Sequence, residues 1–383
     1  MISPVDLTKI LVNKASITPD DGGCLDFISD LLIKENFKIE YLNFNNVKNL
    51  LALYGNEGPL MIFLGHVDVV PAGPLDKWLS PPFIATEKEG FIFGRGTADM
   101  KSAVAASISA LLNFKQELIS KNIKQNIRIG LLLTSDEEGV AIDGIRAVVK
   151  TLQERNMKID YCLVGEPSCE KIFGDTIKIG RRGTLSGKLT LIGKQGHIAY
   201  PENTINPIHQ FGIALPELLK TLWDEGNEHF SATSLQFSNV ASGTGANNVI
   251  PDTLIADFNF RFSSNIDSPS LQEKFESILK EKKLNFKIDW HLGGLPFLTK
   301  TGALLTATEK SIKKIVDITP KYSTAGGTSD GRFIALMGTE VIEFGVINAT
   351  IHQINEHVAI EEITLLEKIY LSLLQELNQH HEQ

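Results

Sequence analysis

The 383-residue sequence predicts an α/β protein in which a mostly parallel sheet is interrupted by a smaller α+β domain. Apolar strand-like runs alternate with helical segments up to about residue 180, an order that is typical of a parallel sheet covered on both faces. The order then becomes strand, helix, strand, strand, helix, strand, as in a split βαβ, ferredoxin-like unit. From about residue 295 the first pattern resumes. We therefore expect a catalytic domain of residues 1–180 and 295–383, with residues 181–294 inserted as a dimerisation or lid domain.

The elements of the first domain follow from short apolar runs bounded by turn residues, which are typical of buried strands. One helix is expected after Asp99, because Val104, Ile108 and Leu111 recur at helical spacing. The predicted strands are 59–65, 126–133, 160–165 and VIEFGV at 341–346, and the predicted helices are 5–15, 22–36, 100–117, 142–155, 301–317 and 360–378.

The inserted domain shows the same kinds of pattern in a different order. One helix is expected to carry Ile208, Phe211, Leu215, Leu218 and Leu222 on a single face. The second helix covers about 269–282, and the predicted strands are 185–192, 232–240, 253–262 and 284–291.

Composition excludes several classes of protein. The formal net charge of −9 disfavours nucleic acid or an anionic membrane as the main partner. Three cysteines do not make a disulfide framework, so a reducing cytoplasm is expected. The first residues do not resemble a signal peptide, and no apolar run reaches the length of a membrane span.

Potential metal ligands stand at the ends of five separate apolar runs. In open parallel sheets, ligands and catalysts gather beyond the carboxyl ends of the strands. Each residue has a simpler interpretation: a hydrogen-bonded loop histidine, a helix N-cap or a solvated turn. Several carboxylates that converge without a cation would repel one another, however. The sequence therefore predicts a metal site from His66, Asp99, the pair Glu137 and Glu138, Glu166 and His352.

Two imidazoles and three carboxylates form the ligand set of a dinuclear zinc-type site. One carboxylate must then bridge, and the remaining acid is free for proton transfer. Two such ions about 3.5–4 Å apart can lower the pKa of a shared water from about 15.7 towards about 7. Asp68 lies two residues after His66 and is the natural candidate to orient the imidazole.

The motifs GHVDVVP, GRGTADMK, SDEEG and GEPS, with the late histidine, resemble the zinc aminoacylase and carboxypeptidase-type amidohydrolases. IGRRGTLSGKL, GHIAYPENTINP, SGTGANNVIP, AGGTSDGRF and ATIHQINE are similar to a narrower group, the succinyl-diaminopimelate desuccinylases of bacterial lysine synthesis. The resemblance covers residues 64–357. It implies hydrolysis of N-succinyl-L,L-2,6-diaminopimelate to succinate and L,L-2,6-diaminopimelate. Acetylornithine deacetylase or dipeptidase activity, and a non-catalytic binding role on the same scaffold, remain as alternatives.

The resemblance also implies roles for single residues. Asp99 becomes the bridging ligand of two Zn²⁺ ions per subunit, for which Co²⁺ can substitute. His66 and Glu166 bind one ion, and Glu138 and His352 bind the other. Glu137 becomes the general acid–base, and Asp68 orients His66. His197 resembles a residue that such enzymes insert from the partner subunit of a homodimer towards the tetrahedral oxyanion.

A substrate with several carboxylates requires local cations in an acidic protein. Arg181 and Arg261 are candidates because guanidinium binds carboxylate bidentately, and Arg182 is a weaker candidate. The resemblance adds contacts from Asn247 and from Gly327 and Thr328 of the glycine-rich turn. Tyr200 is a further candidate, with simple packing as the alternative interpretation.

Overall fold

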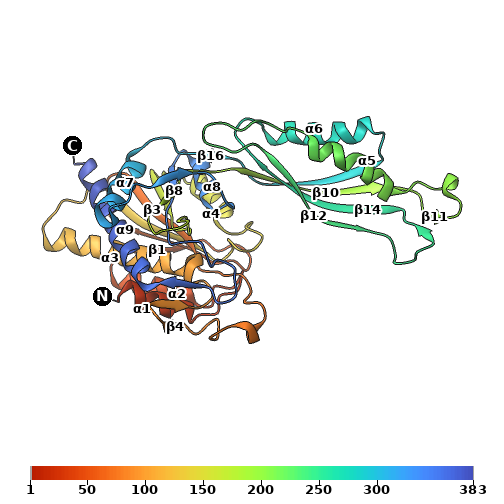
Figure 1. The fold of residues 1–383 in the computed structure, drawn as a ribbon. Helices are drawn as coiled ribbons and strands as arrows, with labels where there is room; N and C mark the ends of the chain where they lie inside the picture. The colour runs from red at the N-terminus through yellow and green to blue at the C-terminus, as the bar shows by residue number, and fades with distance from the viewer. Residues whose placement is uncertain (1, 383) are drawn as a thin grey trace. The chain divides into compact units, whose positions relative to one another are not determined.

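The computed structural model describes residues 2–382 and divides into two compact units (Figure 1). Unit 1 consists of Met1–Gly180, Leu298–Ser323 and Ser329–Gln383, and unit 2 of Arg181–Phe297 and Thr324–Thr328. This division differs from the expected one at residues 295–297 and 324–328. The short loop groups with unit 2 because Arg181 Nη1 donates to the carbonyl of Ala325 at 2.9 Å, and the Thr324 hydroxyl donates to the carbonyl of His229.

Unit 1 is built on an eight-stranded sheet in the order β1-β2-β6-β3-β7-β18-β8-β17. Its four central strands, β6, β3, β7 and β18, are parallel to one another, so the predicted mostly parallel sheet is confirmed. Antiparallel pairing occurs where β1 meets β2, β2 meets β6 and β18 meets β8. The bounds are β1 (Lys38–Tyr41), β2 (Asn49–Tyr54), β3 (Leu60–His66), β6 (Arg128–Thr134), β7 (Tyr161–Val164), β8 (Thr176–Lys178), β17 (Lys321–Ser323) and β18 (Glu340–Glu343).

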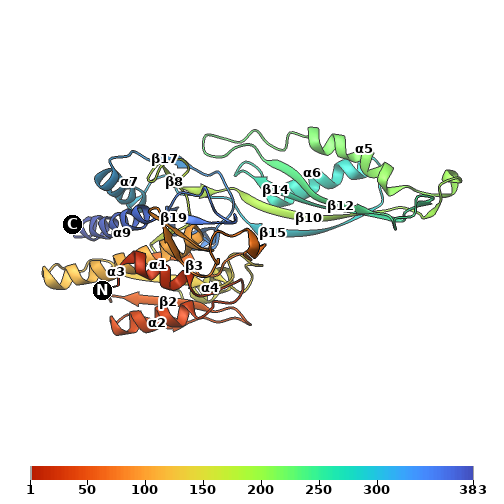
Figure 2. The same ribbon diagram turned by 60° about the horizontal axis from the view of Figure 1, so that its bottom comes forward.

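Helices cover this sheet, and α9 packs against both α3 and α7 (Figures 1 and 2). The contact is apolar because α9 buries Ile363, Leu366, Ile369, Leu373 and Leu377 along its length. These residues belong to one core cluster that also includes the inner faces of the strands. The helices are α1 (Pro4–Val12), α2 (Cys24–Lys34), α3 (Ser102–Ser120), α4 (Ile145–Glu154), α7 (Ala303–Val316), α8 (Gly331–Ile334) and α9 (Ile360–His380), with short turns η1 (Leu75–Lys77) and η4 (Ala335–Met337).

One of the five apolar runs that precede candidate ligands does not join the main sheet. The run before Asp99 forms β5 (Phe91–Phe93) in a separate three-stranded sheet with β4 (Thr86–Lys88) and β19 (His357–Ala359). Strand β5 pairs antiparallel with both neighbours. A run of three apolar residues carries no information about which sheet it joins, so the sequence could not distinguish the two cases.

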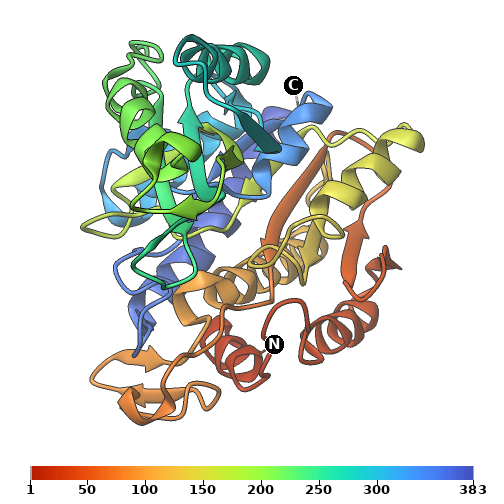
Figure 3. The same cartoon turned by 90° about the vertical axis from the view of Figure 1, so that its right-hand side faces the viewer.

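Unit 2 contains a four-stranded sheet in the order β12-β14-β10-β15, with every neighbouring pair antiparallel. This is the strand order of the ferredoxin-like unit that the sequence predicted. Helices α5 and α6 lie on one face of the sheet (Figures 2 and 3). The bounds are β10 (Gly183–Ile192), α5 (Pro207–Lys220), β12 (Ser234–Ser242), β14 (Thr253–Phe262), α6 (Ser268–Glu281) and β15 (Phe286–Gly294), with two short strands, β11 (Gly196–His197) and β13 (Val249–Ile250), paired outside the sheet.

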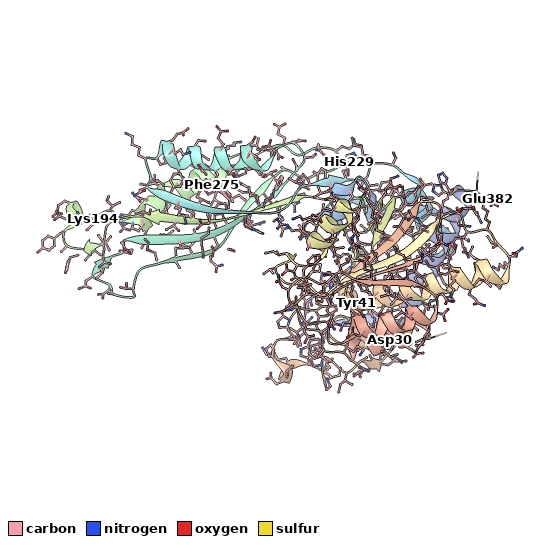
Figure 4. The ribbon with its side chains drawn as sticks, turned by 180° about the vertical axis from the view of Figure 1, so that it is seen from behind. Asp30, Tyr41, Lys194, His229, Phe275 and Glu382 are labelled. Carbon is pink, nitrogen blue, oxygen red and sulfur yellow. The ribbon has the colours of Figure 1, made fainter. Side chains whose placement is uncertain are left out.

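The core of unit 2 is aromatic. Alternate residues of β14 are buried, as expected for a strand with one face on the core. Phe258 of that strand stacks on Phe275 of α6 with ring centroids 4.4 Å apart, and Figure 4 shows Phe275 between the helix and the sheet. Unit 2 therefore has its own hydrophobic core.

Three further features complete the description. Strands β9 (Gly180–Arg181) and β16 (Phe297–Leu298) lie where the chain passes between the units. The three cysteines are buried and unpaired. Among residues 2–382, no helix combines the length and apolar character that a bilayer crossing requires.

Candidate metal centre

Four neighbouring parallel strands bring four of the five predicted ligands to one edge of the main sheet. Strand β3 ends at His66 itself, and Glu138 follows β6. Glu166 lies two residues beyond β7, and His352 lies in the turn-rich segment after β18. Because the carboxyl ends of parallel strands open at the same edge, the sheet order alone places these side chains together.

The fifth residue, Asp99, arrives from a helical turn, η2 (Thr97–Lys101), just before α3. Its backbone is not helical, with φ −121° and ψ 93°. The side chain lies between the two histidines: Oδ1 is 3.2 Å from Nε2 of His66, and Oδ2 is 3.3 Å from Nε2 of His352. One carboxylate therefore presents one oxygen to each imidazole.

The remaining carboxylates divide between the two histidines. Glu166 Oε1 lies 3.7 Å from Nε2 of His66, and Glu138 Oε1 lies 2.9 Å from Nε2 of His352. Ligand atoms of His66, Asp99 and Glu138 also lie within 4.8 Å of one another. Imidazole nitrogens and carboxylate oxygens are donors that Zn²⁺ takes, and the set separates into two halves at the two oxygens of Asp99. The residues present therefore fit a pair of metal ions.

Asp99 and the two histidines of the centre shift one another's pKa values towards the charged forms. Burial alone would raise the pKa of Asp99, but hydrogen bonds from His352 and His66 outweigh it and hold that pKa well below its usual range. Hydrogen bonds to Asp99 and Glu138 raise the pKa of His352 to about 10. Burial opposes the charged form of His66, yet Asp99, Asp68 and Glu166 raise its pKa well above 6.5. The site therefore attracts positive charge strongly.

Glu137 lies beside the half that contains His66 and Glu166. Its carboxylate can approach within 4.8 Å of the ligand atoms of both His66 and Glu166. Burial raises the pKa of Glu137 well above its ordinary 4.5, and neighbouring carboxylates add to the effect. A carboxyl group with a strongly raised pKa in such a cluster is suited to accept and return a proton near neutral pH.

Asp68 is fully buried and connects His66 to the loop that carries Glu137. Nδ1 of His66 lies 2.9 Å from the backbone carbonyl of Asp68 and 3.6 Å from its carboxylate, so the close contact is with the carbonyl. The Asp68 carboxylate instead accepts the backbone N–H groups of Glu137 at 3.4 Å and Glu138 at 3.1 Å. The residue therefore contacts the imidazole with its backbone and the acidic loop with its side chain.

Local backbone features place the other ligands. His352 has φ 59°, a left-handed conformation that costs free energy for a residue with a side chain and is retained at functional sites. A Cβ atom on Gly345 would lie 2.4 Å from the backbone oxygen of Glu166, so only glycine permits this close approach. Neither feature is visible in the spacing of the motifs.

The predicted substrate contacts of unit 2 form two groups. The first lies where β10 begins: Arg181 donates to the Ala325 carbonyl, and a Cβ atom on Gly326 would lie 2.7 Å from Arg181 Nη1. Gly327 and Thr328 continue that loop. Arg261 faces Thr184, the second residue of β10, across the sheet. These side chains therefore belong to one end of unit 2.

The second group lies beyond the other end of β10. His197 pairs with Val249 in β11 and β13, and the ring centroids of His197 and Tyr200 are 5.7 Å apart. Asn247 precedes this pairing, and all three predicted contacts are exposed. Figure 4 labels Lys194 and His229, which mark the two ends of unit 2. The ten residues of β10 separate the groups, a span of roughly 30 Å at about 3.3 Å per residue.

Sequence reasoning missed three residues near the centre. Asp330 is 3% exposed, and neither carboxylate oxygen has a hydrogen-bond partner among residues 2–382. Burial raises its pKa to about 7, opposed by the charges of Arg332 and His66. Arg95 and Glu356 form a buried ion pair beside Asp99. Asp330 and Glu356 fall inside motifs AGGTSDGRF and ATIHQINE, but no spacing rule distinguishes them from ordinary surface acids.

Solved structures with the same fold share little sequence. An M20 family metallo-carboxypeptidase from Sulfolobus solfataricus superposes with a TM-score of 0.85 at 18% identity, covering 99% of this chain and 100% of that one. A tripeptidase from Staphylococcus aureus gives a TM-score of 0.78 at 19% identity, with 98% of each chain covered. At this identity the comparison establishes the fold alone.

Sequence relatives are much closer. A succinyl-diaminopimelate desuccinylase from Methylobacillus flagellatus is 48% identical over 377 residues, which is 98% of this chain and 100% of that protein. The protein of the same name from Coxiella burnetii is 49% identical over 375 residues, 98% of this chain and 99% of that protein. The model of peptidase family M20/M25/M40 matches residues 62–376, which include every predicted ligand. The chain therefore belongs to peptidase family M20/M25/M40.

Proposed function

We propose that this protein hydrolyses N-succinyl-L,L-2,6-diaminopimelate to succinate and L,L-2,6-diaminopimelate. The observation that carries the substrate is the 47–49% identity, along nearly the whole chain, to succinyl-diaminopimelate desuccinylases. The observation that carries the chemistry is Asp99, with one carboxylate oxygen at each of two histidines.

The proposed cofactor is a pair of Zn²⁺ ions in each subunit, with Co²⁺ as a possible substitute. His66 and Glu166 would hold one ion, Glu138 and His352 the other, and Asp99 would bridge them. The distances that support this assignment run from 2.9 to 3.7 Å between the imidazole nitrogens and the carboxylate oxygens. When bound, such ions supply Lewis-acid chemistry, which polarises the scissile carbonyl and makes a water more acidic.

Glu137 is the proposed general acid–base. It would accept a proton from the attacking water and deliver it to the departing amine, so that one carboxyl group serves both half-steps. Burial raises the pKa of Glu137, which favours the protonated form that must donate to the departing amine. Asp68 is proposed to position both His66 and the backbone of Glu137, through the contacts described above.

The substrate carries several carboxylates, and the proposed contacts supply matching donors. Arg181 and Arg261 would bind carboxylate groups at the end of unit 2 where β10 begins, and Gly327 and Thr328 offer a backbone N–H and a hydroxyl there. Arg181 is 6% exposed and already braced by the Ala325 carbonyl, so its guanidinium loses little freedom on binding.

We further propose a homodimer in which His197, Tyr200 and Asn247 act on the partner's substrate. The length of β10 keeps His197 roughly 30 Å from Arg181 within the same unit, too far for both to contact one small molecule. Exposed apolar side chains near His197 are consistent with a subunit contact on this part of unit 2. They are Ile198, Ile205, Ile208 and Ile213, each 46–58% exposed.

A substrate panel tests the proposal. Zinc-reconstituted protein is assayed side by side with succinyl-diaminopimelate, acetylornithine and dipeptides, and kcat/KM is compared. Succinyl-diaminopimelate is expected to be cleaved fastest. Faster cleavage of acetylornithine or a dipeptide would overturn the substrate assignment while leaving the metal chemistry intact. Less than one metal ion per chain, together with no hydrolysis, would favour a binding role.

We place the enzyme in the cytoplasm, where its three free cysteines would remain reduced.

A further inference from the structure

A buried ion pair lies directly behind the bridging aspartate. Arg95 and Glu356 are 2% and 1% exposed, and Arg95 Nη1 donates to Glu356 Oε2 at 2.8 Å. The rest of the Glu356 carboxylate is also occupied. Gly96 N–H donates to Oε2 at 3.0 Å, and Ala98 and Asp99 N–H donate to Oε1 at 2.9 and 3.1 Å. Four N–H donors therefore reach the Glu356 carboxylate, two at each oxygen.

Two of the three backbone donors, Ala98 and Asp99, belong to η2, the turn that presents Asp99, and the third, Gly96, immediately precedes it. Backbone N–H groups that converge in a turn form a site for an anion. Here the anion is a side chain from 257 residues further along the chain. Glu356 therefore fixes the backbone of Asp99 from outside its own turn.

Arg95 extends the connection to two other ligand-bearing segments. Its Nη1 donates to the carbonyl of Gln353 at 3.0 Å, next to His352, and its Nη2 reaches the carbonyl of Pro71 at 3.4 Å, in the segment after His66. The guanidinium also lies over the ring of Trp78, 5.2 Å from the centroid. The segments that carry His66, Asp99 and His352 are thus joined through one ion pair.

We propose that Arg95 and Glu356 are positioning residues that set the mutual geometry of Asp99 and His352, and thereby the affinity for the metal ion that these two share. This inference rests on the proposed paired-metal site. The physical reason is that a bridging carboxylate must present both oxygens at once, and it can do so only when the backbone that carries it holds its Cα and Cβ at the right position and direction. Residues that orient metal ligands typically change metal affinity by about 10–100-fold when removed.

The variant Glu356→Gln tests the proposal, because the amide keeps the shape but replaces one accepting oxygen with a donor that faces N–H groups. Metal-free protein is titrated with Zn²⁺ by calorimetry and with Co²⁺ by visible absorption. We expect the second metal equivalent to bind about 10–100-fold more weakly and the first to change less. Arg95→Lys, which keeps the charge but loses the fork of donors, is expected to give a smaller loss of the same kind.

Glu340→Gln is the matched control. Glu340 also places a carboxylate at a helix start from a distant segment, accepting the N–H of Leu305 at 2.9 Å, but it lies at the opposite end of β18 from the ligands. This variant should lower the melting temperature and leave both metal affinities unchanged. A purely structural Glu356 would behave the same way, so unchanged affinity for the second equivalent in folded Glu356→Gln overturns the inference.

Two outcomes separate this inference from the proposed function. If the unsubstituted protein binds fewer than two ions, the paired-metal site itself fails. If it binds two and both Glu356→Gln and Arg95→Lys bind them equally well, only the positioning role fails. Should Glu356→Gln not fold, Arg95→Lys decides the matter by the same titration.

Discussion

The metal-ligand edge of unit 1, around Asp99, and the outer loops of unit 2, which carry His197, Tyr200 and Asn247, differ in how exposed their side chains are. Asp99 is 8% exposed, and both of its carboxylate oxygens already engage histidines. Tyr200 is 60% exposed, and the imidazole of the exposed His197 accepts the N–H of Ala199 at Nδ1, at 3.0 Å. The metal-ligand side chains therefore already contact one another, whereas the side chains of His197 and Tyr200 are exposed to solvent. We expect substitutions in the first region to affect chemistry and metal binding, and those in the second to depend on assembly.

The largest expected effect comes from Glu137→Gln, which keeps the side-chain shape but cannot carry the proton. We expect kcat to fall by about 10²–10⁴-fold while both metal ions are retained. Steady-state kinetics with metal analysis measures both quantities. Normal turnover would remove Glu137 from the mechanism, and loss of a metal ion would make it a ligand instead.

The outer loops are tested by His197→Ala. If His197 stabilises the oxyanion from the partner subunit, kcat should fall by about 10²–10³-fold. Mixing this variant with Glu137→Gln should restore part of the activity, because a heterodimer contains one complete site. Exposed His291 on β15 of the same unit offers the control His291→Ala, which should change neither kinetics nor rescue. Absence of rescue, with subunit exchange demonstrated, would argue against action across an interface.

The hydrogen bonds among the candidate ligands should make metal affinity depend on pH. Because hydrogen bonds to Asp99 and Glu138 raise the pKa of His352 from 6.5 to about 10, the metal-free imidazole is protonated at neutral pH. A metal ion must displace that proton, so metal affinity should rise with pH up to about 10 and fall as pH decreases. The dependence is about tenfold per pH unit for each proton released.

Calorimetric titration with Zn²⁺ in buffers of different ionisation enthalpy counts these protons. His66, whose pKa is also raised, should contribute a second proton. The variant His352→Ala should release one proton fewer. Metal binding at pH 7 that releases no proton would contradict the charge state deduced for the ligand edge.

The smallest expected effect concerns substrate binding by Arg181, at the end of unit 2 where β10 begins. Arg181→Lys keeps the charge but loses the fork of donors, so KM for succinyl-diaminopimelate should rise about tenfold with little change in kcat. Its sequence neighbour offers the matched control Arg182→Lys, for which we expect a smaller change. An equal rise in KM for both variants would indicate general charge attraction and not a specific contact.

The fold class and the positions of most central elements could be predicted from sequence because both depend on local pattern. Alternating apolar runs identified β3, β6 and β7, and the change of order near residue 180 identified the ferredoxin-like unit. The small sheet that contains β5 could not be predicted, since three apolar residues fit either sheet. Strands β1 and β2, an antiparallel pair at the sheet edge, were also missed.

For the site, residue type and strand-end position selected the six candidate residues, and the structure brings their side chains together. The choice of Glu138 over Glu137 as a ligand came from the family resemblance, and both lie close to other candidate ligands. The supporting contacts were not predictable in the same way. Glu356 accepts from amides 257–260 residues away, and the left-handed backbone of His352 depends on the folded loop. Such features come from tertiary structure, so a motif can contain the residue without revealing what it contacts.

The central claim is that Asp99 is the bridging ligand of a dinuclear metal site. Anomalous diffraction at the zinc absorption edge, from crystals of zinc-reconstituted protein, tests it most directly. We expect two peaks about 3.5–4 Å apart, one at His66 and Glu166, the other at Glu138 and His352, with Asp99 contacting both. A single peak, or two peaks that do not share Asp99, would contradict it.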